Sequence, residues 1–226
     1  GFGKAAYHAF FYTISAFNNA GFALNSSSLV PYFNNLPVNL VITALFMIGG
    51  IGFLVLIDIS THKKWHKLSV NTKIVLLSTL IINFCAFVLI WMLEARNPAT
   101  LGQLSVADQA ITAWFQAVTP RTAGFNTLAI EELTDATTVL MILLMYIGGG
   151  SLSTASGIKI GTFVILIMAT YAFLRRRDDV VILKRTIPQP QVMKALALTI
   201  VSIIMIFIGI FVLSITEKAP LTDIVF

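Results

Sequence analysis

The sequence predicts an all-α membrane protein in which units of span, re-entrant pore helix, filter turn and span repeat around a central pore. Three observations support this fold class. Hydrophobic residues make up 57% of the 226 residues and charged residues only 11%, with a mean hydropathy of +0.88, a composition typical of proteins that cross a membrane several times. Apolar stretches of bilayer length alternate with short basic loops. Two segments of the chain also repeat each other in the same order.

Three apolar stretches have the length of about 20 residues that a helix needs to cross the hydrocarbon core: residues 38–57, 74–93 and 195–215. A fourth, residues 139–174, is interrupted by GGGSLSTASGIK at residues 148–159. Each Gly costs about 1 kcal/mol of helix propensity relative to Ala, and Ser and Thr compete for backbone hydrogen bonds. Since unwound backbone at membrane depth is tolerated inside protein or along a water-filled cavity, the break indicates an ion or substrate path. The alternative is a small-residue face for close helix packing.

The distribution of charge predicts the orientation of the chain. Loops 61–73 and 175–194 hold most of the Lys and Arg residues and are expected in the cytoplasm, whereas the acidic stretches 94–112 and 126–135 are expected outside. Residues 106–119 are apolar but lie between two outer stretches, so they must enter and leave the membrane on the same side as a re-entrant pore helix. Because the basic residues cluster in loops, the net charge of +5 reports orientation, and no nucleic-acid partner is expected.

An internal repeat follows the same plan. Ala20-Gly21-Phe22 recurs as Ala123-Gly124-Phe125 at a shift of 103 residues (from 21 to 124), and each copy follows a short aromatic helix. Gly49-Gly50 matches Gly148-Gly149 at a shift of 99 (from 49 to 148), and residues 73–94 are echoed by 194–217. The copies have the same orientation, so we expect a symmetry axis along the membrane normal.

The repeat divides the chain into five parts. Residues 1–60 are the end of one pore-loop unit, with its pore helix, filter turn and inner span, and residues 61–73 are a cytoplasmic basic loop. Residues 74–174 form a complete pore-loop unit with a broken inner helix, and residues 175–194 a second cytoplasmic basic loop. Residues 195–226 hold the first span of the next unit and the beginning of its pore helix. Because both ends fall inside repeats, we expect the sequence to be part of a longer chain.

Two turns are predicted to form a cation filter. Their residues are Asn19, Ala20, Gly21 and Phe22, and Thr122, Ala123, Gly124 and Phe125. Each turn follows the C-terminal end of a short helix, where the helix dipole is negative. Gly accepts backbone angles that turn carbonyls toward one axis, and Phe is expected to wedge the turn against the surrounding helices. Rings of such carbonyls replace the hydration shell of a cation. The alternative is that AGF closes a tight extracellular turn.

Four other polar residues are interpreted more simply. Asn18, like Asn19, is expected to brace its turn with its side chain and not to coordinate an ion. Arg121 is expected to point sideways into a structural pair at the outer edge of the filter, without a role in transport. Asp58 is expected to be the solvated inner end of a span. Lys159 follows the interrupted stretch, where a charge is costly. It either stabilises the closed loop or extends to the cytoplasmic interface.

These motifs resemble a known family. The turns FNNAGF (residues 17–22) and TPRTAGFNT (residues 119–127), with GGGSLSTASGIK, resemble the Trk/Ktr/HKT superfamily of potassium transporters, most closely the bacterial Ktr membrane subunit. The resemblance implies that this chain covers the end of the second of four fused units, all of the third and the beginning of the fourth. It also implies that Gly21 and Gly124 are the filter glycines, which accompany preference for K+.

By the same resemblance, the interrupted stretch is an intramembrane gate in the cavity under the filter. Its residues are Gly148, Gly149, Gly150, Ser151, Leu152, Ser153, Thr154, Ala155, Ser156 and Gly157, followed by Lys159. The family usually has a glycine pair before Ile-Lys, whereas this chain has Ser156-Gly157, so the loop is expected to be somewhat stiffer.

The resemblance further implies a membrane subunit of a potassium uptake system, multi-pass in the cytoplasmic membrane, with K+ at the filter as its transported ion and no covalent cofactor. A homodimer and a cytoplasmic nucleotide-binding regulatory ring are the implied partners besides the bilayer. Whether Na+ is cotransported in symport or only stimulates the flux stays open.

Three alternatives belong to other classes of protein. An intramembrane serine protease built on Ser151, Ser153 or Ser156 would need a His at matching depth or a pair of intramembrane carboxylates, and the spans provide neither. The chain is therefore not expected to be an enzyme. A broken-helix transporter for another solute would carry polar ligands at the midplane. A scaffold without transport would space its small residues for packing.

Overall fold

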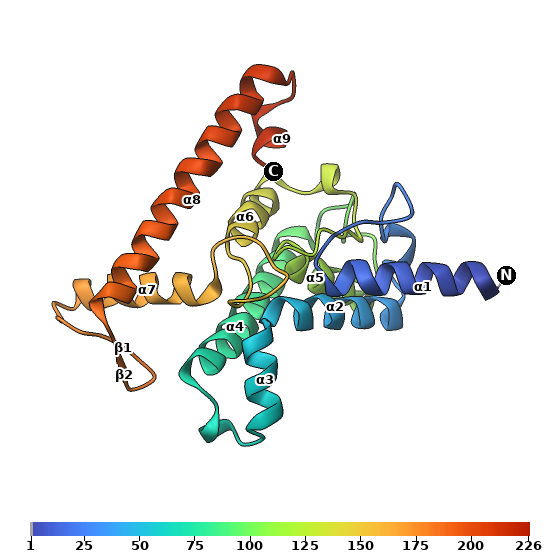
Figure 1. The fold of residues 1–226 in the computed structure, drawn as a ribbon. Coiled ribbons are helices and arrows are strands. Elements are labelled where there is room, and N and C mark those ends of the chain that lie inside the picture. Colours follow the sequence, from blue (N-terminus) through green and yellow to red (C-terminus); the bar gives the residue numbers. More distant parts are fainter. Residues whose placement is uncertain (1) are drawn as a thin grey trace. The chain divides into compact units, whose positions relative to one another are not determined.

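The computed structural model describes residues 2–226, which form two compact units, residues 2–157 and 158–226. The helices of the first unit are α1 (Phe2–Phe17), α2 (Leu36–Ile51), α3 (Phe53–Thr61), α4 (Val70–Glu94), α5 (Val106–Val118) and α6 (Asp135–Tyr146), with short 3-10 turns at Val30–Tyr32, Trp65–Lys67 and Ile130–Glu132 (Figure 1). The second unit contains α7 (Ile160–Leu174), β1 (Val180–Ile182), β2 (Arg185–Ile187), α8 (Gln189–Thr216) and α9 (Leu221–Val225). The all-α architecture predicted from the sequence is confirmed, apart from one short hairpin.

Four helices of the first unit begin at a polar side chain that accepts a hydrogen bond from the first turn. These N-caps are Asn35 for α2, Ser69 for α4, Ser105 for α5 and Thr134 for α6. Such side chains satisfy backbone N–H groups that have no partner within the helix. The helices therefore start where local sequence places a cap in front of an apolar run.

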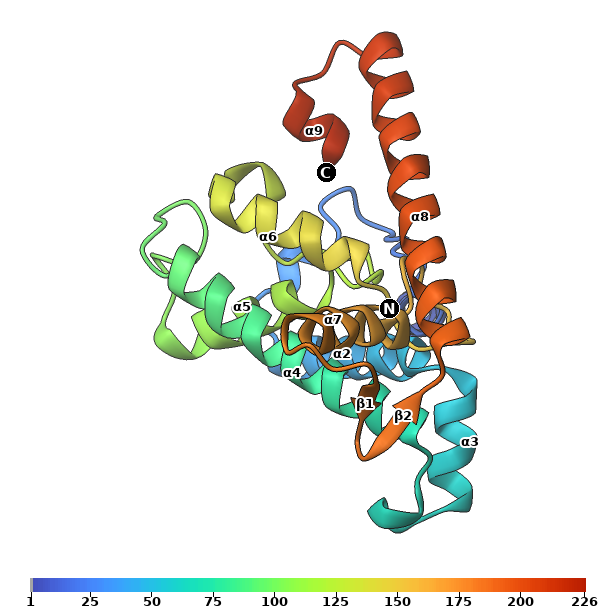
Figure 2. The same ribbon diagram turned by 90° about the vertical axis from the view of Figure 1, so that its left-hand side faces the viewer.

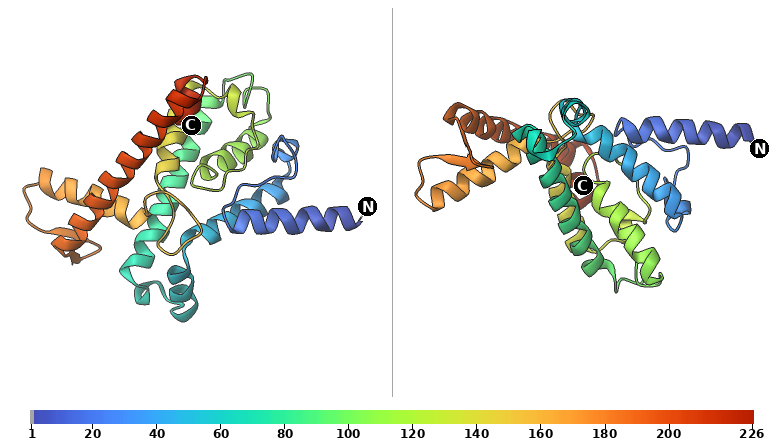
Figure 3. Two further views of the ribbon diagram at one scale, coloured as in Figure 1. Left: turned by 45° about the horizontal axis from the view of Figure 1, so that its top comes forward. Right: turned by 90° about the horizontal axis from the view of Figure 1, so that it is seen from below.

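The short helix α5 lies at the centre of the first unit. In Figure 3, α1 runs beside α2 and α4 runs beside α5. One buried cluster joins α1, α2, α5 and the turns after them; it contains Tyr12, Ala16, Leu29, Ile42, Phe46, Phe115, Val118, Ala123 and Phe125. A second joins α4, α5 and α6, and contains Ala86, Ile90, Leu101, Ala113, Ala117, Leu128 and Leu144. The short predicted helix 106–119 is therefore a buried central element.

The span predicted over residues 38–57 is wrong in one respect, because it is not continuous. Helices α2 and α3 meet at Gly52 with a bend of 94° (Figure 1). Gly52 has φ +101°, and a Cβ at this position would collide with the carbonyl oxygen of Ser151. The Phe53 N–H donates to the Leu152 carbonyl at 3.0 Å. The break thus occurs where the backbone of the interrupted stretch reaches the helix.

Helix α4 matches the second predicted span and ends at a buried carboxylate. Glu94 is fully buried. One oxygen accepts from Thr100 Oγ1 at 2.6 Å and the other from the Thr134 N–H and hydroxyl at 3.0 and 2.7 Å. Asn97 adds a bond at 2.8 Å. Glu94 therefore ties the outer end of α4 to the following turn and to the start of α6.

The second unit contains the third predicted span and an element that the sequence did not indicate. Helix α8 contains the predicted span 195–215, and α9 begins close to the predicted next pore helix. Between α7 and α8 the basic loop forms a hairpin, in which Val180 pairs with Ile187 (Figure 2). Its turn residues Leu183 and Lys184 both have positive φ, of 49° and 64°, as a two-residue primed turn requires.

Candidate functional site

The two AGF turns, residues 19–22 and 122–125, share an unusual backbone. In the first turn φ is +51° at Asn19 and +70° at Gly21; in the second it is +81° at Thr122 and +78° at Gly124. Positive φ thus recurs every second residue, at the same shift of 103 found in the sequence. A non-glycine residue in this region costs about 1–2 kcal/mol, so surrounding contacts must hold both turns.

A hydroxyl group at the end of each preceding helix supplies one such contact. Ser15 Oγ donates to the Phe22 carbonyl at 2.8 Å, and Thr119 Oγ1 donates to the Phe125 carbonyl. The sequence analysis did not single out Ser15 or Thr119, although a hydroxyl residue close before each AGF was visible. The wedge role predicted for Phe fits Phe125, which is 1% exposed, but not Phe22, which is 70% exposed.

The two turns touch at their glycines. A Cβ on Gly21 would lie 2.9 Å from the Ala123 carbonyl oxygen and 3.0 Å from Gly124 Cα, and one on Gly124 would lie 3.1 Å from Gly21 Cα. Neither position therefore has room for a side chain unless the backbone of the other turn moves.

The Gly/Ser loop, residues 148–157, packs against the C-terminal end of α2 through backbone atoms. The Gly150 N–H donates to the Gly50 carbonyl at 2.9 Å, and the Thr154 N–H donates to the Gly49 carbonyl at 3.3 Å. A Cβ on Gly149 or Gly150 would collide with the carbonyls of Gly50 and Ile51. The consecutive glycines predicted to unwind the helix thus also allow this close approach.

The loop is bonded directly to the first AGF turn. Asn19 Nδ2 donates to Thr154 Oγ1 at 2.7 Å and to the Phe46 carbonyl at 3.2 Å, while Thr154 Oγ1 donates to the Phe17 carbonyl at 3.2 Å. Asn18 Nδ2 donates to the Ile14 carbonyl at 2.9 Å. Asn19 therefore braces the turn against α2 and the loop, whereas Asn18 bonds within the end of α1.

Arg121 points toward the loop, and the structural partners expected for it lie there and in α4. Its guanidinium is buried and donates to the Gly148 carbonyl at 2.9 Å, to the Ile147 carbonyl at 3.4 Å and to Asn83 Oδ1 at 2.9 Å. A cavity of about 20 Å³ lies beside these groups and is also lined by Gly50 and Gly149. Arg121 thus joins the second AGF turn to the start of the loop and to α4.

With this geometry established, comparison with known proteins assigns the family. The sequence model of the TrkH family, described as a cation transport protein, matches residues 3–225. The chain belongs to the TrkH family. It is a multi-pass membrane protein, and α4 and α8 are each long and apolar enough to cross a bilayer, as is the bent pair α2–α3 if counted as one span.

Several relatives of the chain in the TrkH family have descriptive names. Ktr system potassium uptake protein B of Bacillus subtilis is 46% identical over 226 residues, covering all of this chain and 51% of the relative. The protein of the same name from Vibrio alginolyticus is 42% identical, over 50% of its length. Potassium/sodium uptake protein NtpJ of Enterococcus hirae is 35% identical, over 49% of its length. The chain therefore spans about half the length of these relatives.

A solved structure has the same fold. The crystal structure of the potassium transporter TrkH from Vibrio parahaemolyticus matches with a TM-score of 0.77 at 20% identity, covering 90% of this chain and 44% of that one. The fold expected from the sequence resemblance is thereby confirmed.

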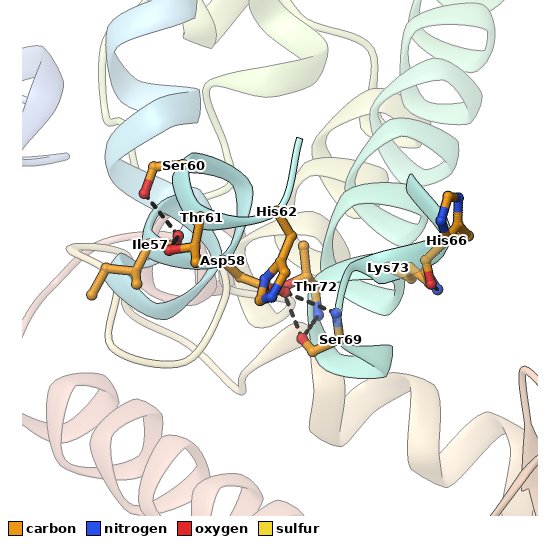
Figure 4. Close-up of polar contacts among 9 residues, drawn as sticks. All are labelled: Ile57, Asp58, Ser60, Thr61, His62, His66, Ser69, Thr72 and Lys73. Carbon is orange, nitrogen blue, oxygen red and sulfur yellow. Dashed lines mark hydrogen bonds and ion pairs between the residues drawn. The ribbon is translucent and has the colours of Figure 1, made fainter. Parts of the chain in front are cut away.

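A further polar cluster lies at the inner end of the unit, between α3 and α4 (Figure 4). Asp58 Oδ1 pairs with His62 Nδ1 at 2.9 Å, and Asp58 Oδ2 accepts from the Ser69 N–H at 2.9 Å and from Thr72 Oγ1. The prediction that Asp58 is only a solvated helix end is therefore wrong. It fastens the basic loop to the start of α4. Lys159, in the second unit, is half-buried at the N-cap of α7.

Proposed function

We propose that this chain forms part of the conduction pathway of a potassium uptake system in the cytoplasmic membrane. In this proposal K+ passes the backbone carbonyls of the two AGF turns, and the Gly/Ser loop is the gate below them. The supporting observation is the shared alternation of positive φ in two turns that touch at Gly21 and Gly124. The choice of K+ as the transported ion rests on the relatives that are named for potassium uptake.

The chemistry follows from the partners of the turns. Carbonyl oxygens replace the water shell of a cation without a formal charge, and each turn is held by bonds from Ser15, Asn19 or Thr119 that need no ion. Two turns supply part of a ring, and the rest would come from sequence outside this chain. The loop bonded to Asn19 and Arg121 would then close the path beneath them.

The partners follow from the resemblance and from charge. The basic loops 61–73 and 175–194 carry most of the cationic side chains and would face anionic lipid and a cytoplasmic nucleotide-binding ring subunit, with the full-length protein a homodimer. The relative NtpJ is named for both potassium and sodium, so Na+ dependence belongs to the same proposal.

The test is ion uptake by the full-length protein in a host that lacks other potassium uptake. Gly124→Ser should reduce the preference for K+ over Na+ by about tenfold, because strain of about 1–2 kcal/mol at positive φ adds to the contact with Gly21. A deletion within residues 151–156 should raise the flux. Gly209→Ser is the matched control, since a Cβ there meets nothing within 4 Å.

Two results would contradict the proposal. If Gly124→Ser keeps the wild-type ratio of Rb+ to Na+ uptake, the AGF turns do not select the ion. If the deletion leaves the flux unchanged while the protein reaches the membrane in normal amount, the loop is not a gate. Loss of preference in Gly209→Ser as well would show that the effect is not specific to the turn.

A further inference from the structure

Arg121 binds the one end of α6 from which the Gly/Ser loop begins. Helix α6 ends at Tyr146, and the guanidinium of Arg121 donates to the carbonyls of the next two residues, Ile147 and Gly148. The last carbonyls of a helix have no partner within it, and the helix dipole is negative there. A cation at this point therefore satisfies both the hydrogen bonds and the charge of the helix end.

Asn83 fixes the direction of Arg121. It lies in the middle of α4 and is 1% exposed, and a buried amide in a membrane helix is unfavourable without a partner. A guanidinium only donates, so Asn83 must present its Oδ1 to Arg121, and the bond measures 2.9 Å. Asn83 Nδ2 has no hydrogen-bond partner among residues 2–226. The hydrogen bond to Arg121 therefore explains why a buried amide is tolerated at this position of α4.

The guanidinium is held by its hydrogen bonds. The adjoining cavity of about 20 Å³ has room for about one water molecule. No carboxylate of the described residues pairs with Arg121, so the carbonyl dipoles of Ile147 and Gly148 stabilise its positive charge. The start of the loop is therefore held by charge-assisted bonds, which are stronger than neutral ones.

The other end of the loop is held differently. Thr154 is bonded to Asn19 and to the Phe17 carbonyl through neutral groups, and Thr154 is exposed on this chain. Besides its backbone bonds to α2 and α3, the loop thus has a charge-assisted attachment to the second AGF turn at its first residue and a neutral side-chain attachment to the first AGF turn six residues later.

We propose that Arg121, oriented by Asn83, is a positioning residue that anchors the hinge of the gating loop to the second filter turn, whereas the Thr154–Asn19 bond is the latch that opens. The inference rests on the proposed function of the loop as a gate. Opening then rotates the loop about a fixed Gly148, and the state of the gate is linked to the geometry of the Thr122–Phe125 turn through Arg121.

The experiment measures loop position and transport separately. The full-length protein, with Cys85 and any other cysteines replaced, carries Ser153→Cys as a reporter, and its modification by a membrane-impermeant thiol reagent is timed. Arg121→Gln should raise the modification rate by about tenfold, because bonds to a charged group are lost, and should lower the ratio of Rb+ to Na+ uptake. Arg121→Lys keeps the positive charge but loses the planar set of N–H donors of the guanidinium, so it should raise the modification rate by less.

A second variant tests the anchor without removing the charge. Asn83→Leu should also raise the modification rate, whereas Gln116→Leu, which removes a fully buried amide on α5 that does not bind Arg121, should leave it unchanged. A modification rate within twofold of wild type in both Arg121→Gln and Asn83→Leu would overturn the proposal. So would altered ion uptake with unchanged modification, because the charge would then act on the ion and not on the loop.

The two proposals fail in different ways. If the wild-type protein takes up no Rb+ but Arg121→Gln still exposes the reporter, the proposed function fails and the anchor stands. If uptake is selective in wild type and unchanged in Arg121→Gln with an unmoved reporter, the function stands and the anchor fails.

Discussion

The sharpest prediction concerns Thr154, whose hydroxyl joins the Gly/Ser loop to the first AGF turn. Thr154→Val keeps the shape of the side chain and removes two hydrogen bonds, one accepted from Asn19 Nδ2 at 2.7 Å and one donated to the Phe17 carbonyl at 3.2 Å. The loop retains its backbone bond from the Thr154 N–H to the Gly49 carbonyl. The substitution should therefore weaken the closed position without abolishing it.

The magnitude follows from the two bonds. A hydrogen bond contributes about 0.5–1.5 kcal/mol net, so the pair contributes about 1–3 kcal/mol, and the ratio of closed to open loop should fall by about 5- to 150-fold. If the closed state dominates in wild type, the rate of Rb+ uptake rises by up to the same factor. The assay is initial Rb+ uptake by the full-length protein in proteoliposomes at matched protein amount.

The control is Thr170→Val in α7. Among residues 2–226, Thr170 donates to the carbonyl of Leu166 on its own helix, at 2.9 Å, so the same loss of a hydroxyl should leave uptake unchanged. A Thr154→Val protein that folds normally and takes up Rb+ at the wild-type rate, or more slowly, would refute the reasoning, because the loop would then not be held by this bond.

Two further predictions concern structure rather than transport. Glu94→Ala should lower the free energy of unfolding by about 2–4 kcal/mol, because it leaves the Thr134 N–H and hydroxyl without their buried acceptor; thermal unfolding in detergent measures this, and exposed Glu131→Ala is the control that should change little. Asp58→Asn should free the loop between α3 and α4, since an amide replaces the carboxylate that binds His62 and Thr72. Trypsin should then cut at the lysines of this loop faster than in wild type, and an unchanged cutting rate would contradict the fastening role.

Much of the fold could be predicted from the sequence because its signals are local. The length of an apolar run decides whether it crosses the bilayer, which gave α4 and α8 to within a few residues. The short helix α5 was expected from its apolar residues and from the charges that flank it, and it forms at residues 106–118. The AGF turns followed from repetition, and their positive φ at Gly21 and Gly124 is what glycine permits.

Two of the features that the sequence did not show depend on contacts between segments distant in the sequence. The bend at Gly52 depends on backbone of residues 151 and 152, about 100 residues further along, and the sequence of α2 alone does not show it. The direction of Arg121 depends on Asn83 in α4 and on carbonyls at the end of α6. A long side chain next to a turn can point to either face, and only packing decides between them.

The two glycine pairs have the same sequence but different structural roles. Gly49-Gly50 and Gly148-Gly149 match each other in the sequence repeat, which makes them copies of one feature. In the structure Gly149 lies against the carbonyl oxygen of Gly50 and Gly150 against that of Ile51, and the Gly150 N–H bonds to the Gly50 carbonyl at 2.9 Å. After the first pair the chain bends at Gly52 and continues as helix α3, whereas after the second it unwinds into the loop. Gly149 and Gly150 therefore have to be small because they touch the backbone of residues 50 and 51, and Gly49 because it touches the Phe17 carbonyl. A larger side chain at any of these three positions should displace the loop from the AGF turns, although Gly49 itself lies outside the loop.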